Sequence, residues 1–312
     1  MPVTDATDLP SLVDAGARSL GFDDDPDLEI GPFAFGCWRF VGADVTLAQE
    51  LIETALELDM HLIDTADIYG TGFGGGGFGE SEELLGKVLA AAPELRERMV
   101  LATKGGIRPG VPCDSSPEYL TKACDDSLRR LGVDVIDLYQ VHRPDLLTHP
   151  LDVAETLDAL VADGKVRAVG VSNHSSSQIA ALAEYLEAPL VSTQPEYSAA
   201  HLTPLRDGTL DQAMELGLAV LAWSPVAGGR LATGEGLRSE LVAVLDELAG
   251  REAVDRATIA LAFVLSHPSS PVAILGTQTP QRLRDAQRAL EVHLDRIDCY
   301  RIIEASDGVA QP

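Results

Sequence analysis

Lysine is scarce in this chain, although acidic residues are abundant. Only Lys87, Lys104, Lys122 and Lys165 occur among 312 residues, whereas aspartate and glutamate number 49 and the formal net charge is −26. A surface this acidic repels nucleic acid and anionic membranes, so neither is expected as a partner. A lysine that falls within a predicted strand is therefore unusual and needs a reason.

Long hydrophobic runs and paired cysteines are also missing. No run of about 18 apolar residues without charge occurs, so no membrane span is expected. The first residues lack the basic start and apolar core of a secretory signal. The four cysteines have neither CxxC nor metal-finger spacing: they are Cys37, Cys113, Cys124 and Cys299. We therefore expect free thiols, no metal site and a cytoplasmic location.

A polar, acidic leader is predicted over residues 1–30, ahead of one domain over residues 31–312. The leader contains the run DDDPD at residues 23–27, and no linker interrupts the remainder. Hydrophobic residues make up 46% of the chain, which is enough for a large core. We expect a single folded domain behind a loosely packed leader.

Apolar runs and amphipathic stretches alternate along that domain. The apolar runs are continuous, which is typical of parallel strands covered on both faces. Amphipathic patterns of helical period follow each run, one of them stopped by Gly132. Eight such units in about 250 residues predict a (β/α)8 TIM barrel, with a doubly wound sheet as the alternative. The predicted strands are residues 33–38, 61–66, 99–104, 135–142, 167–173, 190–194, 218–224 and 271–277.

Polar or aromatic residues follow every predicted strand from the second to the seventh. Active sites of TIM barrels lie at this end of the strands. Taken singly, each residue could cap a loop or be a satisfied core residue, but together they predict a shared pocket. In chain order they are Asp64 and Tyr69, Lys104, His142, Ser172 and Asn173, Gln194, and Trp223 and Ser224.

Four of these residue types suit proton transfer. A free tyrosine has a pKa near 10 and is a poor acid at neutral pH, but a nearby lysine cation such as Lys104 lowers the pKa of Tyr69. Asp64 can hold that lysine charged as an ion pair. His142 can orient a carbonyl oxygen or assist proton transfer. The set predicts a reaction that develops an alkoxide, such as carbonyl reduction.

Seven ordered motifs over about residues 31–300 resemble the aldo-keto reductase superfamily: LIDTADIYG, LATKGG, DLYQVHRPD, AVGVSN, TQPEYS, LAWSPVAGGRL and ILGTQTPQRL. The resemblance implies a monomeric or weakly associating barrel. It implies that NADPH, with NADH as the alternative, reduces a small aldehyde or ketone. It further implies Tyr69 as the proton donor, Lys104 as its pKa-lowering partner, Asp64 as the ion-pair acid and His142 as the orienting histidine.

The resemblance also implies the cofactor contacts. Ser172, Asn173 and Gln194 match the groups that hold the nicotinamide carboxamide, Trp223 matches the aromatic ring that stacks on the nicotinamide, and Trp38 is expected to line the carbonyl pocket. Many family members carry a basic residue where this chain has glycine 276, which leaves the preference for NADPH over NADH open. The pyrophosphate segment is matched by Ser224, Pro225, Gly228 and Arg230, and the adenosine phosphate segment by Gly276, Thr277, Gln278 and Arg282.

The segment GTGFGGGGFG, residues 70–79, contains the pattern G-x-G-x-x-G of dinucleotide-binding proteins. That site needs a helix starting at the last glycine and an acidic residue after the next strand. Here the helix is predicted to begin at Ser81 or Glu82, and the next strand ends in Lys104. We interpret the pattern as a chance match within an insertion. We predict that the insertion is a flap over the substrate mouth, with Phe73 and Phe78 as apolar contacts.

Two other functions fit parts of the pattern. The alternative to a reductase is a cofactor-binding regulatory or redox-sensing protein of the same fold with little turnover. Slow hydride transfer together with tight cofactor binding would favour it. A lyase or isomerase on the same barrel leaves Trp223 and the set Ser172, Asn173 and Gln194 unexplained.

Overall fold

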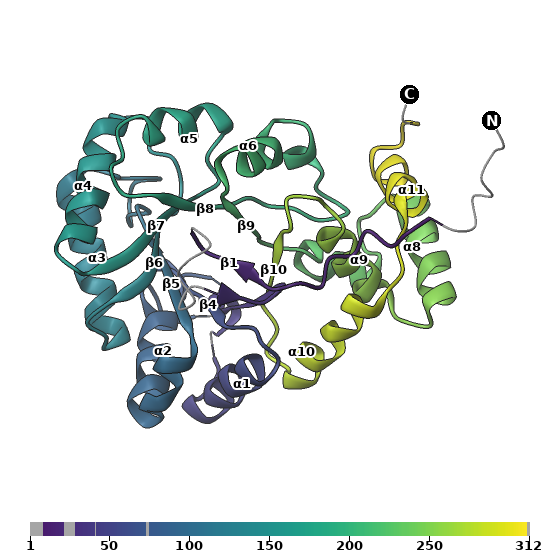
Figure 1. The fold of residues 1–312 in the computed structure, drawn as a ribbon. Coiled ribbons are helices and arrows are strands. Elements are labelled where there is room, and N and C mark those ends of the chain that lie inside the picture. The colour runs from purple at the N-terminus through teal and green to yellow at the C-terminus, as the bar shows by residue number, and fades with distance from the viewer. Residues whose placement is uncertain (1–8, 22–28, 41, 73–74, 311–312) are drawn as a thin grey trace.

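A closed barrel of eight parallel strands forms the centre of the molecule in this computed structural model (Figure 1). The structure describes residues 9–21, 29–40, 42–72 and 75–310. The strands pair in chain order, and β10 closes the barrel between β9 and β3. The eight predicted strands and the TIM barrel are confirmed. The strands are β3 Phe33–Gly36, β4 Leu62–Asp64, β5 Val100–Gly105, β6 Ile136–Val141, β7 Val166–Ser172, β8 Leu190–Gln194, β9 Ala219–Ala222 and β10 Val272–Leu275.

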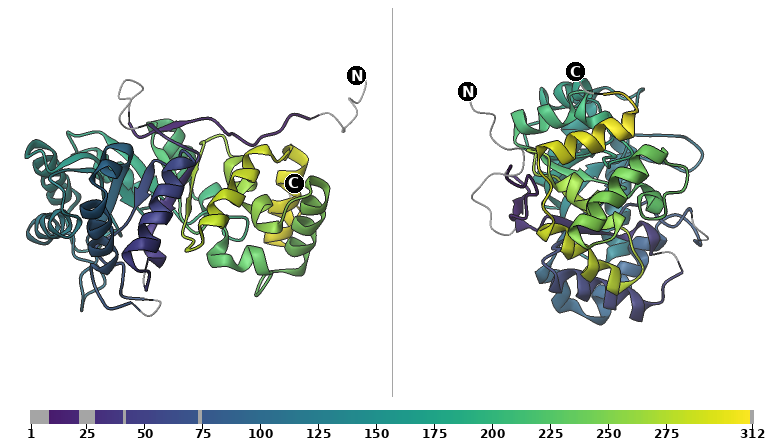
Figure 2. Two further views of the ribbon diagram at one scale, coloured as in Figure 1. Left: turned by 90° about the horizontal axis from the view of Figure 1, so that it is seen from below. Right: turned by 90° about the vertical axis from the view of Figure 1, so that its right-hand side faces the viewer.

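Helices surround the barrel because each connection runs back along its outside (Figure 2). The two helices predicted between the last two strands are present as α8 and α9, and α11 packs against α8. Helix α2 begins at Glu80, slightly earlier than predicted. The helices are α1 Val45–Glu57, α2 Glu80–Ala91, α3 Pro117–Leu131, α4 Pro150–Ala162, α5 Ser176–Ala183, α6 Thr209–Leu216, α7 Arg230–Thr233, α8 Ser239–Glu252, α9 Arg256–Leu265, α10 Pro280–Ala286 and α11 Arg296–Asp307.

Local sequence signals explain where several of these helices start and stop. The side chain of Asp44 accepts a hydrogen bond from the amide of Leu47 at the start of α1, and Ser175 forms a capping box with Gln178 at the start of α5. Helix α3 ends at Gly132 in the left-handed conformation with φ of 69°, which suits glycine. These short-range signals fix the lengths of the helices and therefore the loops that carry the polar residues.

Apolar residues fill two separate regions. The barrel interior holds one cluster, which includes Leu62, Leu138 and Ile274. A larger cluster fills the layer between the strands and the helices, and includes Tyr139 and Leu261. Since each strand buries both faces, its sequence shows no alternation between apolar and polar residues.

The described part of the leader covers one end of the barrel. Strand β1 (Arg18–Ser19) pairs antiparallel with β2 (Glu29–Ile30), and this hairpin crosses in front of the barrel in Figure 1. Leu20 and Ile30 are buried in the same cluster as the barrel interior. Arg18 is also buried, and its Nε donates to the carbonyl of Ser270 at 2.9 Å. The expectation of a loosely packed leader therefore does not hold for these residues, because two apolar side chains anchor them.

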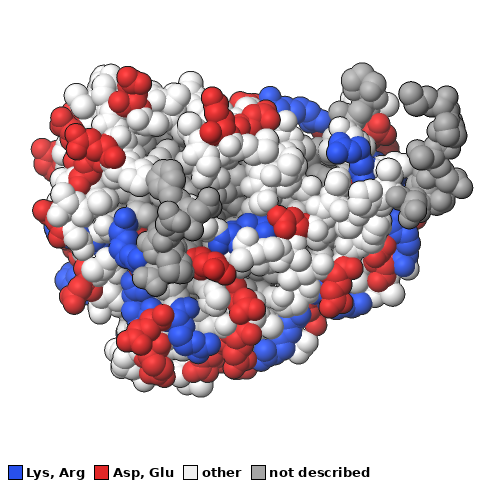
Figure 3. All heavy atoms as spheres, viewed as in Figure 1, with Lys and Arg blue, Asp and Glu red and all other residues white. Residues whose placement is uncertain are grey.

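Surface charge is mixed on the face that carries this hairpin. Figure 3 shows lysine and arginine side chains lying among aspartate and glutamate along the lower edge of that face. All four cysteines are free, as predicted. Within the described ranges, no helix combines the length and the apolar character that a membrane crossing requires.

Candidate active site

The predicted site residues gather at the end of the barrel opposite the hairpin. Parallel strands place their C-terminal ends at one rim, so residues far apart in the chain meet there. Of the predicted set, Asp64 ends β4, Lys104 lies in β5, His142 follows β6, Ser172 ends β7, Gln194 ends β8 and Trp223 follows β9.

Lys104 is the centre of the site. Its side chain is fully buried, and its Nζ lies 2.7 Å from Oδ2 of Asp64, 2.8 Å from the carbonyl oxygen of Thr65 and 3.2 Å from Oη of Tyr69. An ammonium group has three hydrogens to donate, so all three have an acceptor. The lysine that the composition marked as unusual is therefore held in one position and aimed at the tyrosine.

The charge state of this group follows from opposing effects. Burial alone would lower the pKa of Lys104, but Asp64 and Tyr69 raise it above its ordinary value, so the ammonium stays charged. Burial raises the pKa of Tyr69, and this outweighs the lowering by Lys104. Lys104 lowers the pKa of Tyr69, as expected. Burial of the phenol raises that pKa by more, so the pKa of Tyr69 is not lowered overall. Tyr69 is therefore protonated at neutral pH, as a proton donor must be.

His142 lies beside the phenol. The rings of Tyr69 and His142 are nearly perpendicular, at 77°, with centroids 5.9 Å apart. Burial, and then the charges of Lys104 and Arg143, hold the pKa of His142 well below its usual range. The imidazole is therefore neutral, and one ring nitrogen carries a hydrogen that can be donated to a carbonyl oxygen. Nδ1 is buried and has no hydrogen-bond partner among the described residues.

Two glutamine amides hold the other oxygen of Asp64. Nε2 of Gln194 donates to Oδ1 at 3.0 Å, and Nε2 of Gln140 lies 3.4 Å from the same atom. Gln194 was expected to hold the nicotinamide carboxamide rather than Asp64, and Gln140 was not among the predicted site residues. Gln140 could have been found because it lies two residues before His142, and in a strand such residues share a face. The contact from Thr65 uses the backbone and has no sequence signal.

A chain of hydrogen bonds connects the next three predicted residues. Oγ of Ser172 donates to the carbonyl of Gln194 at 2.9 Å, and Nδ2 of Asn173 donates to Oγ of Ser172 at 2.8 Å. Nε1 of Trp223 then donates to Oδ1 of Asn173 at 3.0 Å. Asn173 has a φ of 59°, a left-handed conformation that asparagine tolerates better than most residues and that is often found at functional sites. This arrangement fixes the indole at the rim.

The segment after Trp223 exposes its backbone. Ser224, Ala227, Gly228 and Gly229 all have positive φ. A Cβ built on Gly228 or Gly229 would meet no atom within 4 Å, so the backbone there faces open space that a ligand can approach closely. Successive backbone amides in such conformations form anion-binding concavities. The segment therefore suits a pyrophosphate, as predicted from its sequence, and Pro225 is buried beneath it.

The last predicted contacts follow β10. Gly276, Gln278 and Arg282 are exposed, and Thr277 accepts a hydrogen bond from the amide of residue 279. Arg230, at the end of the preceding segment, is exposed as well. These residues are exposed or partly exposed and lie on the two loops that follow the adjacent strands β9 and β10, where a dinucleotide could reach them. 

Trp38 lies on the turn after the first strand of the barrel. It follows β3 in a short 3-10 helix, Cys37–Arg39, and its side chain is 43% exposed. The neighbouring Arg39 donates from Nη2 to the carbonyl of Gly228 at 3.0 Å, which ties this turn to the segment after Trp223. An exposed indole on a turn held in this way is available to a substrate.

The glycine-rich segment does not form a phosphate loop. Three acidic residues, Glu80, Glu82 and Glu83, occupy the first turn of α2 and would repel a phosphate at its N-terminus. Residues 73–74, which include the predicted flap contact Phe73, lie outside the described residues. The ring of Phe78 packs near Arg130 of α3, with 5.6 Å between its centroid and Cζ. The predicted placement of Phe78 at the substrate mouth is therefore not supported.

Comparisons of this chain with known proteins agree on one protein family. A model described as the Aldo/keto reductase family matches residues 32–307. A 6-dehydroglucose reductase of Novosphingobium aromaticivorans is 48% identical over 298 residues, which cover 95% of this chain and 97% of that protein. A 6-dehydroglucose reductase of Agrobacterium fabrum is 35% identical, with 90% and 96% covered. The solved glycerol dehydrogenase of Gluconobacter oxydans matches with a TM-score of 0.80 at 28% identity, covering 95% of this chain and 96% of that one.

Proposed function

Since the chain belongs to the aldo/keto reductase family, we propose that it is an NADPH-dependent oxidoreductase that reduces an aldehyde or ketone to an alcohol. The observation that carries the proposal is the buried contact of Tyr69 with Lys104, itself paired with Asp64. A nicotinamide dinucleotide, when bound, supplies the hydride. The residues of this chain orient the carbonyl, exclude water and deliver the proton.

The proton comes from Tyr69. As negative charge develops on the carbonyl oxygen, the phenol donates its hydrogen, and the fixed ammonium of Lys104 stabilises the phenolate left behind. Asp64 keeps Lys104 charged and in place. His142, neutral and adjacent to the phenol, donates a hydrogen bond to the same carbonyl oxygen. General acid catalysis of this kind typically contributes about 10²–10⁴-fold to a rate.

Residues along the rim from β7 to β10 would hold the cofactor. Ser172, Asn173 and Gln194 would bind the carboxamide end, and Trp223 would offer its face to the nicotinamide ring. For Gln194, this role requires sharing its amide with Asp64. The loops after β9 and β10 take the phosphates through backbone amides and through Arg230 and Arg282. NADH remains the alternative cofactor, because position 276 is glycine.

The substrate carbonyl enters beside Trp38. Two relatives carry the name 6-dehydroglucose reductase and a similar structure is a glycerol dehydrogenase. Both names describe polyhydroxylated compounds. We therefore assign a small hydroxylated aldehyde or ketone as the substrate class.

The proposal is tested by following NADPH oxidation at 340 nm with a panel of hydroxylated carbonyl compounds. We expect Tyr69→Phe to lose about 100-fold or more in turnover while NADPH still quenches tryptophan emission. Tyr300→Phe is the matched control, because Tyr300 lies exposed on α11, and it should keep full turnover. Turnover that survives in Tyr69→Phe would contradict the proton donor. Tight NADPH binding with no turnover on any carbonyl would favour the regulatory alternative.

A further inference from the structure

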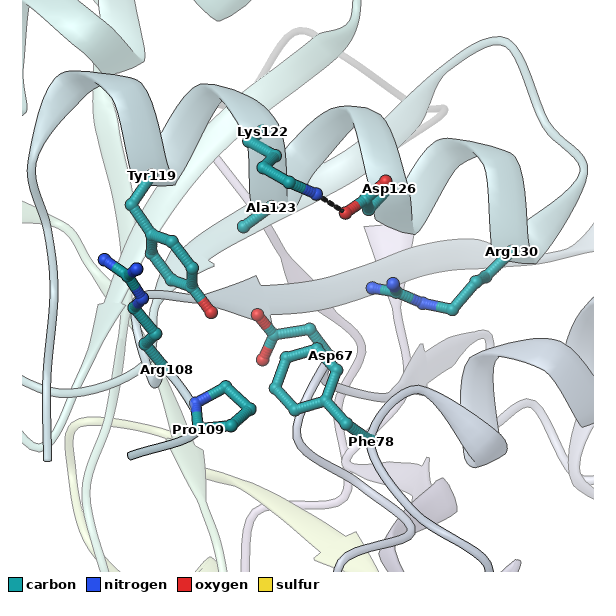
Figure 4. Close-up of a pocket in the computed structure, with 9 residues that line it drawn as sticks. All are labelled: Asp67, Phe78, Arg108, Pro109, Tyr119, Lys122, Ala123, Asp126 and Arg130. Atoms are coloured by element: carbon teal, nitrogen blue, oxygen red, sulfur yellow. Dashed lines mark hydrogen bonds and ion pairs between the residues drawn. The ribbon is translucent and has the colours of Figure 1, made fainter. Parts of the chain in front are cut away.

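A second cavity lies between the barrel rim and helix α3, where the connections after β4 and β5 leave their strands. It has a volume of about 320 Å³ and lies among the connection that follows β4, the connection that follows β5 and helix α3. Asp67 and Phe78 come from the first connection, Arg108 from the second, and Tyr119 and Arg130 from α3. Figure 4 shows Asp67 between the rings of Tyr119 and Phe78, with the guanidinium of Arg130 pointing toward it.

Asp67 is the unusual member of this cavity. Its side chain is completely buried, and neither carboxyl oxygen has a hydrogen-bond partner among the described residues. Burial raises the pKa of Asp67 well above its ordinary value, and Glu82 adds to this, against the opposing charge of Arg130 and the nearby backbone amide of Ile68, which does not reach hydrogen-bond geometry. Buried polar groups are normally hydrogen-bonded, so an unpaired carboxyl group that lines a cavity points to a ligand that completes it.

The other polar groups of the cavity already have partners. Arg108 pairs with Asp114 at 2.7 Å, Arg130 pairs with Glu82 at 2.7 Å, and the hydroxyl of Tyr119 donates to a backbone carbonyl at 2.9 Å. The fourth pair joins the two remaining charged residues of the cavity, Lys122 and Asp126. A ligand therefore finds one open hydrogen-bonding position, at Asp67.

The walls favour a neutral ligand with an apolar face. The rings of Phe78 and Tyr119 line the cavity. The guanidinium carbon of Arg130 lies 5.6 Å from the centroid of the Phe78 ring, and that of Arg108 lies 5.5 Å from the centroid of the Tyr119 ring. A cation would meet these guanidinium groups. An anion would approach a chain of net charge −26, at guanidinium groups already paired with Asp114 and Glu82. A polyhydroxylated molecule has hydroxyl donors for the carboxyl group and C–H faces for the rings.

From this geometry we infer that the cavity between the β4–α2 connection and α3 is a second ligand site, which binds a neutral polyol or sugar through a hydroxyl group that donates to Asp67. The half-buried Phe78 covers the carboxyl group and moves aside when the ligand enters. The inference does not depend on carbonyl reduction, because the hydrogen bond between Asp67 and Lys104 joins backbone atoms, amide to carbonyl oxygen at 3.0 Å, and leaves the ammonium with Asp64, Thr65 and Tyr69.

The test is a titration of the full chain, labelled with 4-fluorophenylalanine, with sorbitol, followed by fluorine NMR. Comparison with Phe78→Leu identifies the Phe78 resonance among the seven phenylalanines. We expect a saturable shift of that resonance. Asp67→Leu should weaken sorbitol binding at least tenfold, whereas Asp126→Asn, a change in the same cavity at a residue already paired, should leave it within twofold.

Several outcomes would overturn the inference. These are no saturable shift with sorbitol, equal affinity in Asp67→Leu, or shifts confined to phenylalanines other than Phe78, which would place the polyol at the barrel mouth. Saturation by methylammonium or inorganic phosphate but not by sorbitol would reject a neutral ligand. Should Asp67→Leu not fold, Asp67→Asn retains the side-chain shape and is expected to weaken binding at least threefold; unchanged affinity there would also overturn the inference.

Discussion

Asp64 and Asp67 lie three residues apart and are both buried, yet their surroundings are opposite. Asp64 faces the barrel interior and has Lys104 at 2.7 Å and Gln194 at 3.0 Å. Asp67 faces the outside of the barrel and has no hydrogen-bond partner among the described residues. Asp64 therefore belongs to a hydrogen-bonded network, whereas the fold buries the carboxyl group of Asp67 without giving it a hydrogen-bond partner among the described residues. Burial alone therefore does not tell the two carboxyl groups apart, but their hydrogen-bond partners do.

The largest effect on stability is expected from a substitution at Asp64. The change Asp64→Asn leaves the ammonium of Lys104 buried without its counter-charge, and we expect the free energy of unfolding to fall by about 3–5 kcal/mol. Urea unfolding measures this loss, and carbonyl reduction should fall with it. The double change Asp64→Leu with Lys104→Met removes both charges and should recover much of the stability but none of the activity. A double variant as unstable as Asp64→Asn would contradict the charge argument.

At Asp67 the same type of change should act in the opposite direction. Asp67→Asn removes a buried, unpartnered carboxyl group, whose desolvation is worth about 1–3 kcal/mol. We therefore expect the free energy of unfolding to rise at neutral pH, with carbonyl reduction within twofold of wild type. A loss of stability in the same urea experiment would show that Asp67 has a structural partner and would remove the contrast with Asp64.

The pH dependence of that gain sharpens the contrast. The folded pKa of Asp67 is raised, so above the ordinary value of about 3.9 the folded chain keeps a proton that the unfolded chain has released. Wild-type stability therefore decreases as pH rises above that value, until Asp67 ionises in the folded state as well. The advantage of Asp67→Asn should be small near pH 4 and grow toward neutral pH. An advantage independent of pH would assign it to packing.

The smallest effect is expected at the exposed edge of the second cavity. Lys122 and Asp126 form an ion pair in which the lysine side chain is 69% exposed. Exposed pairs of this kind contribute about 0.2–1 kcal/mol. Asp126→Asn should therefore change the urea midpoint little, and added salt should reduce the difference further. A loss comparable to that of Asp64→Asn would mean that the cavity wall is held by this pair.

The sequence predicted the barrel and the gathering of polar residues at its rim because both follow from position along the chain. Continuous apolar runs marked the eight strands, and the residue after each run marked the rim where Asp64, Lys104 and His142 meet. The sequence could not show that burial outweighs Lys104 in setting the pKa of Tyr69, because that depends on how tightly the loops pack. It also did not show the anchoring of Leu20 and Ile30, since an acidic segment separates them and their pairing is tertiary.

The enclosure of Lys104 has a consequence for labelling chemistry. Its nitrogen is fully buried with every hydrogen donated, whereas Lys87 and Lys122 are exposed and Lys165 is partly so. Acylating reagents need a free amine with an open lone pair, so they should modify the three outer lysines and spare the fourth. The chain can therefore be attached to a support or a dye through its outer amines with the contact between Lys104 and Tyr69 left intact. Any acylation of Lys104 would then report exposure of its nitrogen.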